Sequence, residues 1–100
     1  MHLLIESSNI EVNRRIKSLI TEKINKKLSR LLSALHQENL QASIFLKKLK
    51  YDIYEVSLSV NLPGKKDLFA KTKHIDFTSA LVDLTSQIEK QIEKIKPNLL

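Results

Sequence analysis

The chain has 100 residues, 42% of them hydrophobic, and contains no cysteine. This length fits one domain, residues 1–100, and the lack of cysteine excludes disulfides, thiol catalysis and cysteine-based zinc sites. Seventeen basic against eleven acidic residues give a net charge of +6, which is typical of domains that bind polyanions such as nucleic acids.

The N-terminal segment predicts a strand and no targeting signal. It begins MHLLIE, without the positively charged leader or the long apolar run of a signal peptide, so we expect a cytoplasmic protein. No apolar run in the sequence approaches the roughly 18 residues of a membrane-spanning helix. Residues 3–7 are a short apolar opening that indicates a first strand.

A long amphipathic helix is predicted next, from Asn13 to about Leu35. Apolar side chains recur there at steps of three or four residues, which places them on one face of a helix. No glycine or proline interrupts the segment, and the polar stretch 36–39 ends it. The apolar face consists of Ile16, Ile20, Ile24, Leu28, Leu31 and Leu35.

Three strands are predicted in the middle of the chain. Residues 41–50 and, most clearly, residues 54–62 alternate apolar and polar side chains. Residues 51–52 form either a turn or a bulge between them. The Pro-Gly pair at 63–64 marks a tight turn, after which residues 68–75 return as the last strand of an antiparallel meander.

A second helix follows these strands. Asp76 can cap it, its apolar stripe runs from Phe77 to Ile95, and Pro97 ends it. The element order is therefore β-α-β-β-β-α, an α+β fold with a four-stranded sheet. Because each helix has one apolar face, we expect both to pack on the same face of the sheet. The opposite face should be more polar.

The sequence shows no converging set of reactive groups of the kind that an enzyme needs. His2, His36 and His74 match no zinc motif, so we predict neither a metal site nor a cofactor. The nearest approach to a carboxylate pair is Glu89 and Glu93, four residues apart in the second helix among lysines. That pattern favours a solvated face of mixed charge, and we predict no enzymatic activity.

The positive charge is concentrated in the first helix. Between residues 12 and 35 there are seven basic side chains and a single acidic one, Glu22. Projected at about 100° per residue, four or five of these cations lie on the face turned away from the core. Lys17 falls within the apolar stripe, from which we expect its long side chain to extend to the solvent. Lys90 and Lys94 extend the patch if the two helices lie side by side. The predicted RNA-binding residues are Arg15, Lys23, Lys26, Lys27, Arg30, Lys90 and Lys94.

Such a surface has two interpretations. Lysine-rich helix faces are common as plain solvated surface. A phosphate-binding surface would instead give an affinity that falls with salt, because each bound cation releases condensed counterions. The few aromatic residues support little base stacking, and core or dimer packing is expected for Phe69 and Phe77. We therefore expect recognition of RNA backbone and shape without base readout.

Three segments together resemble one known family. They are the opening segment 5–13, the segment AKTKHIDF at 70–77, and the helical segment IEKQIEK at 88–94. In their order and spacing they resemble the ribosome hibernation promoting factors, also called ribosome-associated translation inhibitors or the sigma-54 modulation protein family. The resemblance covers nearly the whole chain and implies the same β-α-β-β-β-α fold.

The resemblance also implies a function. Members of that family bind the small ribosomal subunit in the channel for messenger and transfer RNA, which inhibits translation and preserves idle ribosomes under stress and in stationary phase. By position, Lys23, Lys90 and Lys94 match the family's RNA contacts best. Thr78 and Gln87 depart from its usual tyrosine and lysine. The chain resembles the short form, so dimerisation of ribosomes would require a second hibernation factor.

Two other functions fit the residues. The α-β-β-β-α part has the element order of a double-stranded RNA-binding module, although no loop is clearly suited to a minor groove. A regulatory protein-interaction domain, whose basic helical face meets an acidic partner, is the other alternative. Binding that survives nuclease treatment would favour the protein partner over RNA.

Overall fold

The computed structural model describes residues 2–33, 41–62 and 67–99, with side chains described up to residue 94. The elements follow the predicted order. They are β1 (His2–Ser8), α1 (Arg14–Ile20), the π-helical turn η1 (Thr21–Asn25), α2 (Lys26–Ser33), β2 (Gln41–Lys48), the 3-10 turn η2 (Lys50–Asp52), β3 (Tyr54–Asn61), β4 (Leu68–His74) and α3 (Phe77–Leu99).

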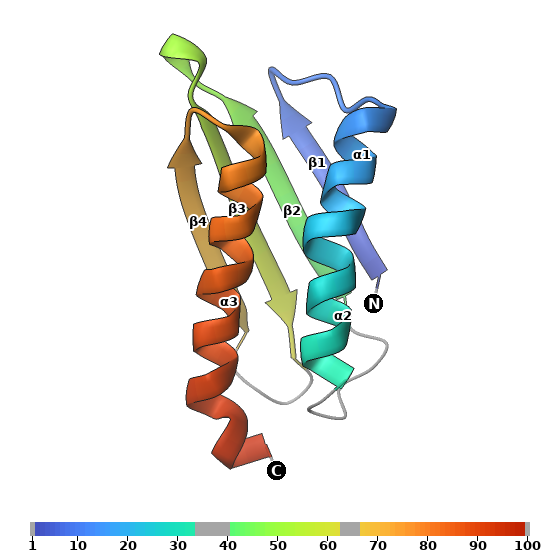
Figure 1. Ribbon diagram of the computed structural model, residues 1–100, viewed down its shortest axis with the longest axis vertical. Helices are drawn as coiled ribbons and strands as arrows, with labels where there is room; N and C mark the ends of the chain where they lie inside the picture. The colour runs from blue at the N-terminus through green and yellow to red at the C-terminus, as the bar shows by residue number, and fades with distance from the viewer. Residues whose placement is uncertain (1, 34–40, 63–66, 100) are drawn as a thin grey trace.

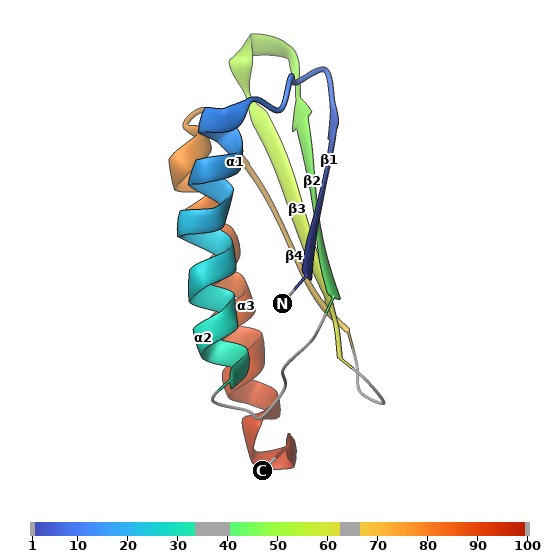
Figure 2. The same cartoon turned by 90° about the vertical axis from the view of Figure 1, so that its right-hand side faces the viewer.

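The molecule has two layers, a sheet and a pair of helices. The four strands are arranged in the order β1-β2-β3-β4. β1 runs parallel to β2, which requires the crossover through the first helix, whereas the other two pairings are antiparallel. Both helices cover the same face of the sheet (Figures 1 and 2). The predicted α+β fold, including the antiparallel meander, is confirmed.

The core lies between the helices and the inward-facing side chains of the sheet. Because side chains alternate along a strand, every second residue points into the core. The strand register sets Ile44 beside Leu58 and Leu58 beside Ala70, and all three are buried. The helices contribute the buried residues Ile20, Ile24, Leu28, Leu32, Ala80, Leu81, Leu84, Ile88 and Ile92.

The outer face of the sheet is largely polar, as predicted. Ser43 and Ser59 face each other across β2 and β3, with their hydroxyl oxygens 3.0 Å apart. Phe69 points outward and is 56% exposed, so core packing is wrong for this residue and dimer packing stays a prediction. It occupies the outward phase of β4. Phe77 is partly buried against the core, and its ring meets that of Tyr54 edge-on at 5.6 Å.

The first helix, residues 14–33, is continuous but not uniform. Four of its buried residues follow at steps of four, namely Ile20, Ile24, Leu28 and Leu32. In an α-helix each such step turns the side chain by about 40° beyond a full turn, so the stripe would drift away from the core. The wider π-helical turn η1 takes up part of this drift and keeps the four side chains on the sheet.

The observed boundaries differ from the predicted ones at a few positions. β2 ends at Lys48, and η2 follows it with left-handed φ angles of 62° and 57° at Tyr51 and Asp52, so the turn is confirmed and the bulge is wrong. α3 continues through Pro97 to Leu99. Proline removes one backbone hydrogen bond near the end of a long helix, which does not stop the helix there. The predicted helix end at about residue 35, the polar stretch 36–39 and the turn at 63–64 lie outside the described residues.

Two glutamines of α3 cover the outer edge of β4. The side-chain amide of Gln91 accepts a hydrogen bond from the N–H of Phe69 at 3.1 Å and donates one to the carbonyl of Phe69 at 2.6 Å. Gln87 forms the same pair with Lys71, at 3.4 and 3.1 Å. Outward-pointing backbone groups recur every two residues on a strand, and facing side chains recur about every four on a helix. The two amides therefore match the edge as a short extra strand would, and they fasten α3 to the sheet.

Candidate nucleic-acid interface

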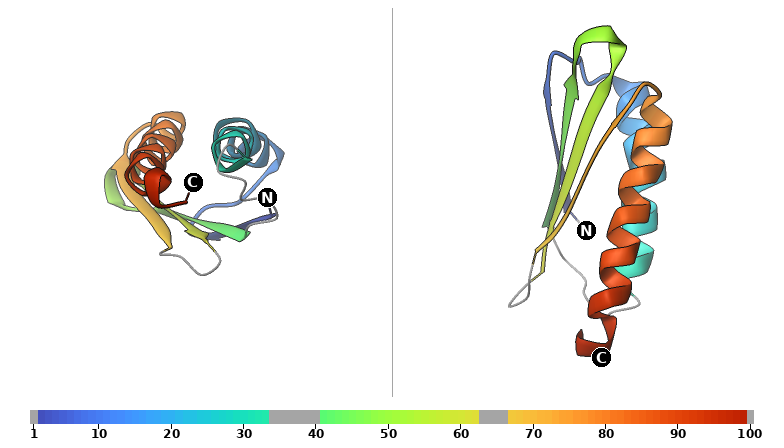
Figure 3. Two further views of the ribbon diagram at one scale, coloured as in Figure 1. Left: turned by 90° about the horizontal axis from the view of Figure 1, so that it is seen from below. Right: turned by 90° about the vertical axis from the view of Figure 1, so that its left-hand side faces the viewer.

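The first helix and α3 lie side by side and run in the same direction (Figures 1 and 3). Both η1 and α2 contact α3. An ion pair between Lys27 Nζ and Glu89 Oε2, at 3.4 Å, joins the two helices. The cations of both helices therefore belong to one layer, which covers a single face of the sheet.

The predicted RNA-binding residues all reach the surface of this layer, but not equally. Those exposed are Arg15, Lys26, Lys27, Arg30, Lys90 and Lys94. Lys23 was predicted on the outward face and is only partly exposed; it belongs to the π-helical turn. Within the part of the chain that the structure describes, Lys27 is the only member of the set that forms an ion pair. The charges of the other members are free of such neutralisation there.

A shallow hollow on the first helix, here called the outer hollow, is lined by cations that a projection at a fixed angle of about 100° per residue places on different faces of the helix. Its volume is about 350 Å³, and it is lined by Arg14, Lys17, Ser18, Thr21, Glu22 and Lys26. Lys17, which the uniform projection places within the apolar stripe, is exposed, as expected of a long side chain that extends from the stripe to the solvent. The wider turn η1 changes the phase of the helix between Lys17 and Lys26, so both line the same hollow.

Arg14 and Lys17 therefore belong to the basic surface, although the predicted set of RNA-binding residues does not include them. The signal for them was the dense run of cations at the start of the helix, Arg14, Arg15 and Lys17. A projection at a fixed angle per residue concealed it, because the helix does not keep that angle.

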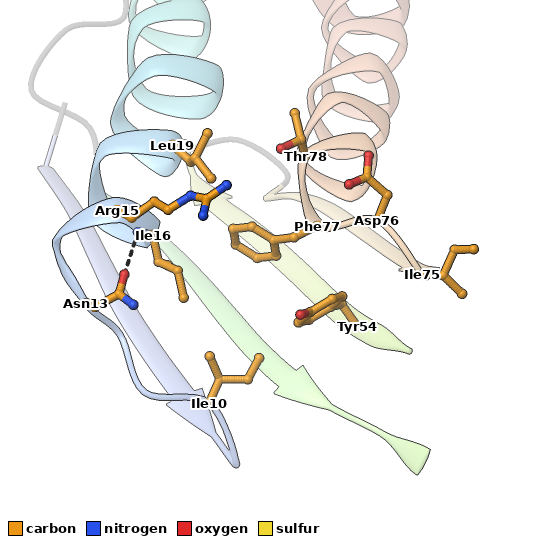
Figure 4. A pocket seen from close by; sticks show the side chains of 10 residues that line it. All are labelled: Ile10, Asn13, Arg15, Ile16, Leu19, Tyr54, Ile75, Asp76, Phe77 and Thr78. Carbon is orange, nitrogen blue, oxygen red and sulfur yellow. Dashed lines mark hydrogen bonds between the residues drawn. The ribbon is translucent and has the colours of Figure 1, made fainter. Parts of the chain in front are cut away.

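A second hollow, here called the N-terminal hollow, opens where the first helix and α3 begin (Figure 4). Its volume is about 370 Å³, and it is lined by Ile10, Asn13, Arg15, Ile16, Leu19, Tyr54, Ile75, Asp76, Phe77 and Thr78. The guanidinium of Arg15 extends from the first helix toward Phe77 and Thr78 (Figure 4). Arg15 and Lys26 thus line two different hollows. Sequence periodicity could not predict this hollow, because its walls come from separate segments.

Both helices begin with a side-chain cap at the N-terminal hollow. Asn13 Oδ1 accepts a hydrogen bond from the N–H of Ile16 at 2.9 Å. The carboxylate of Asp76 accepts one from the hydroxyl of Ser79 at 2.6 Å and one from its N–H at 3.1 Å, so the predicted cap is confirmed. These hydrogen bonds, above all that from the hydroxyl, hold the pKa of Asp76 below its ordinary value. The carboxylate is therefore ionised at neutral pH and engaged within its own helix.

The arrangement of charges favours binding of anions. Glu89 is engaged by Lys27 across the helix pair, which fits the mixed-charge face predicted for α3.

Among the described residues, no group of three or more histidine, cysteine or acidic side chains is placed to hold a metal ion. His36 lies outside the described residues. The helices within the described ranges include none that is long and apolar enough to cross a membrane.

Comparison with known proteins shows which protein family and which solved structures the chain is similar to. A family model described as "Sigma 54 modulation protein / S30EA ribosomal protein" matches residues 3–99. A search of curated protein sequences found no match. Among solved structures, the N-terminal domain of Protein Y from Thermus thermophilus superposes with a TM-score of 0.76, at 22% identity over 95% of this chain and 99% of that one. A ribosomal subunit interface protein from Coxiella burnetii gives a TM-score of 0.74, at 18% identity over 97% and 99%.

The two kinds of comparison support different statements. At 22% and 18% identity the solved structures show that the fold is shared. The family model covers nearly the whole chain, from residue 3 to residue 99. The chain therefore belongs to the family of sigma-54 modulation proteins and S30EA ribosomal proteins.

Proposed function

We propose that the protein is a non-catalytic, ribosome-associated factor. It binds the small ribosomal subunit in the channel for messenger and transfer RNA, inhibits translation and promotes ribosome hibernation. The observation that carries the proposal is the helix layer, in which two parallel helices of a family member present exposed cations on one side of the sheet. The ribosomal subunit interface protein from C. burnetii, which has the same fold, is consistent with it.

The mechanism is electrostatic docking followed by occlusion. Ribosomal RNA presents closely spaced phosphates, and each one neutralised by a lysine or arginine releases condensed counterions. Arg15, Lys26 and Arg30 supply exposed charge from the first helix, and Lys90 and Lys94 extend it over α3. Lys27 contributes less, because Glu89 already offsets its charge. The docked domain fills space that messenger and transfer RNA would occupy, and no bond is made or broken.

The proposal has consequences for partners and location. A factor that binds ribosomes works in the cytoplasm. Within this proposal, a second hibernation factor is the partner for the pairing of two ribosomes.

The experiment that tests the proposal is co-sedimentation of the purified protein with separated small and large ribosomal subunits. It should be run at about 50 mM and about 200 mM monovalent salt, a range over which six to ten phosphate contacts lose about 10³- to 10⁵-fold in affinity. Binding to the small subunit that falls steeply with salt is expected. Addition of the protein to an in vitro translation reaction should then lower protein synthesis in proportion to occupancy.

Two outcomes would contradict the proposal. Absence of binding to either subunit at the lower salt would remove the ribosome as the partner. Displacement of the protein from the subunit by short duplex RNA of unrelated sequence would favour the double-stranded RNA-binding module. A matched competition with the same length of single-stranded RNA shows whether the duplex form is what competes.

A further inference from the structure

We infer that the N-terminal hollow is a binding site for a single nucleotide, with the base against the apolar walls and the phosphate at Arg15. The hollow lies at the start of both helices and is distinct from the outer hollow, with which it shares no lining residue. Its volume of about 370 Å³ falls at the lower end of the range of about 300–1,000 Å³ seen for small-molecule sites. That size suits one nucleotide better than a dinucleotide cofactor.

The walls of the hollow suit a planar ring. Ile16 and Leu19 of the first helix form one side, and Tyr54 and Phe77 form the other (Figure 4). The two aromatic rings meet edge-on, with centroids 5.6 Å apart and an angle of 61° between their planes. A base that enters the hollow would pack against aliphatic side chains on one side and aromatic rings on the other. Contacts between bases and aromatic side chains are a common means of holding unpaired nucleotides.

The polar groups of the hollow suit a phosphate. The guanidinium of Arg15 points into it, and this cation forms no ion pair with an acidic residue in the described ranges. Guanidinium groups bind phosphate through paired, charge-assisted hydrogen bonds. The carboxylate of Asp76 would repel an anion, but it is turned to the hydroxyl and N–H of Ser79. The amide of Asn13 uses its oxygen as the helix cap and retains its NH₂ group as a donor toward a ligand.

A short side chain, Thr78, lines the hollow. Thr78 lies in the wall opposite Arg15, on the first turn of α3 (Figure 4). A tyrosine at this position would place a ring in the space that the inference gives to the base. The substitution Thr78→Tyr therefore closes the hollow without changing any charge.

The nucleotide has two sources with the same chemistry. It is either a free ribonucleoside monophosphate or an unpaired residue of an RNA chain. In the second case the hollow would add the recognition of one base to the backbone binding proposed above, and that reading rests on the proposed function. The cavity and the charge of Arg15 support both equally.

The test is titration of the ¹⁵N-labelled full chain with adenosine 5′-monophosphate, followed by amide chemical shifts. We expect saturable shifts at Arg15, Phe77 and Thr78, and weaker binding of adenosine and of inorganic phosphate when each is titrated alone. Thr78→Tyr and Arg15→Gln should each weaken binding by at least about tenfold, or about 1.4 kcal/mol. The matched controls are Val82→Tyr, an exposed position on α3 outside this hollow, and Lys47→Gln, an exposed cation on β2. Both controls should bind as the unaltered protein does.

Three results would overturn the inference. The first is the absence of saturable shifts up to about 10 mM ligand, far above the millimolar Kd that corresponds to about −4.1 kcal/mol. The second is binding by Thr78→Tyr that equals binding by the unaltered protein. The third is a loss of binding in Lys47→Gln that equals the loss in Arg15→Gln. Co-sedimentation with the small subunit separates the two sources. If Thr78→Tyr weakens subunit binding, the nucleotide belongs to RNA; if subunit binding is unchanged, it is free. Loss of the proposed function would show as no subunit binding by the unaltered protein, with the nucleotide titration unaffected.

Discussion

The first helix and α3 lie in one layer, run in the same direction and bury similar apolar stripes, but they use their polar side chains differently. Residues 14–33 hold seven basic side chains and one acidic one, whereas residues 77–99 hold three of each. α3 engages Gln87 and Gln91 with the backbone of β4, and Glu89 with the first helix. Of the seven cations in the first helix, Lys27 alone forms an ion pair within the described part of the chain.

This difference separates a fastening helix from a binding helix. Gln87 and Gln91 of α3 hold the helix on the sheet, so changing them should affect stability. The cations of the first helix have few internal partners, so they can be changed with little cost to the fold and a large cost to RNA binding. Exposure alone does not distinguish the two roles, because Lys26 and Lys90 are both exposed.

The largest effect is expected from charge reversal on the first helix. Lys26→Glu with Arg30→Glu should weaken binding to the small subunit by roughly a hundredfold and lower the salt slope by about 2, one for each lost phosphate contact. The thermal unfolding midpoint should change little, since both side chains are exposed. Co-sedimentation at several salt concentrations measures both quantities. The matched control is Lys47→Glu with Lys50→Glu, which changes the net charge equally away from the helices; an equal loss there would mean that total charge, not the first helix, determines binding.

The next largest effect tests the fastening role of α3. Gln87→Ala with Gln91→Ala removes four hydrogen bonds to the edge of β4. The free energy of unfolding should fall by about 2 kcal/mol, at roughly 1 kcal/mol for each partly exposed amide. That corresponds to a drop of about 10 °C in Tm for a domain of this size. Differential scanning calorimetry measures the change.

The same double variant should also associate with itself, because its strand edge is then open to pairing. Sedimentation velocity at increasing protein concentration detects this. Gln41→Ala, an exposed glutamine on β2, serves as the control and should leave both Tm and association unchanged. If the double variant has an unchanged Tm, the two glutamines do not fasten the helix.

A smaller effect is expected from charge reversal on α3. Lys90→Glu with Lys94→Glu changes the net charge as much as the reversal on the first helix does. These lysines share their helix with three acidic residues, so the field that they add at the surface is weaker. Binding to the small subunit should fall by about tenfold, which corresponds to about 1.4 kcal/mol. A loss as large as that of Lys26→Glu with Arg30→Glu would show that both helices bind RNA equally.

The fold was predictable to the extent that it depends on local pattern. The alternation at 54–62 and the three- and four-residue steps of the helices each report which face is buried, so the element order and the layers follow from them. The π-helical turn was harder to predict, because shifting the hydrogen-bond partner by one residue does not change which residues of the segment are apolar. In retrospect the strict spacing of Ile20, Ile24, Leu28 and Leu32 indicates it.

The candidate site was less predictable, because its features arise between segments distant in the sequence. Lys27 is a surface cation by sequence, and only the packing of α3 shows that Glu89 partners it. By resemblance to the family, Gln87 stands where a lysine is usual. Only the position of β4 shows that the amide of Gln87 binds the backbone of Lys71. The periodicity of the sequence predicts which side chains of a helix or strand face the solvent. It does not predict which side chains pair with each other, because those pairs form through tertiary contacts.

The smallest effect concerns the caps, which also differ between the two helices. The first helix is capped by a neutral residue, Asn13, and α3 by a charged one, Asp76. Because folding lowers the pKa of Asp76 from its ordinary value of 3.8, the carboxylate stabilises the folded chain above that value and loses this effect as the pH falls through the folded pKa. Asp76→Asn keeps a capping side chain but does not titrate, so it should be slightly less stable than the unaltered protein at pH 6.

That deficit should disappear as the pH is lowered from about 5 to about 2, because protonation removes the charge that distinguishes Asp76 from asparagine. Thermal unfolding midpoints of both proteins across this range measure it. Asn13→Asp is the reciprocal change and should introduce the same pH dependence at the first helix, where the cap accepts from the N–H of Ile16. A deficit of Asp76→Asn that stays constant with pH would mean that the shape of the cap, and not its charge, is what α3 requires. The effect is small because Asp76 is exposed, and solvent and salt screen its charge.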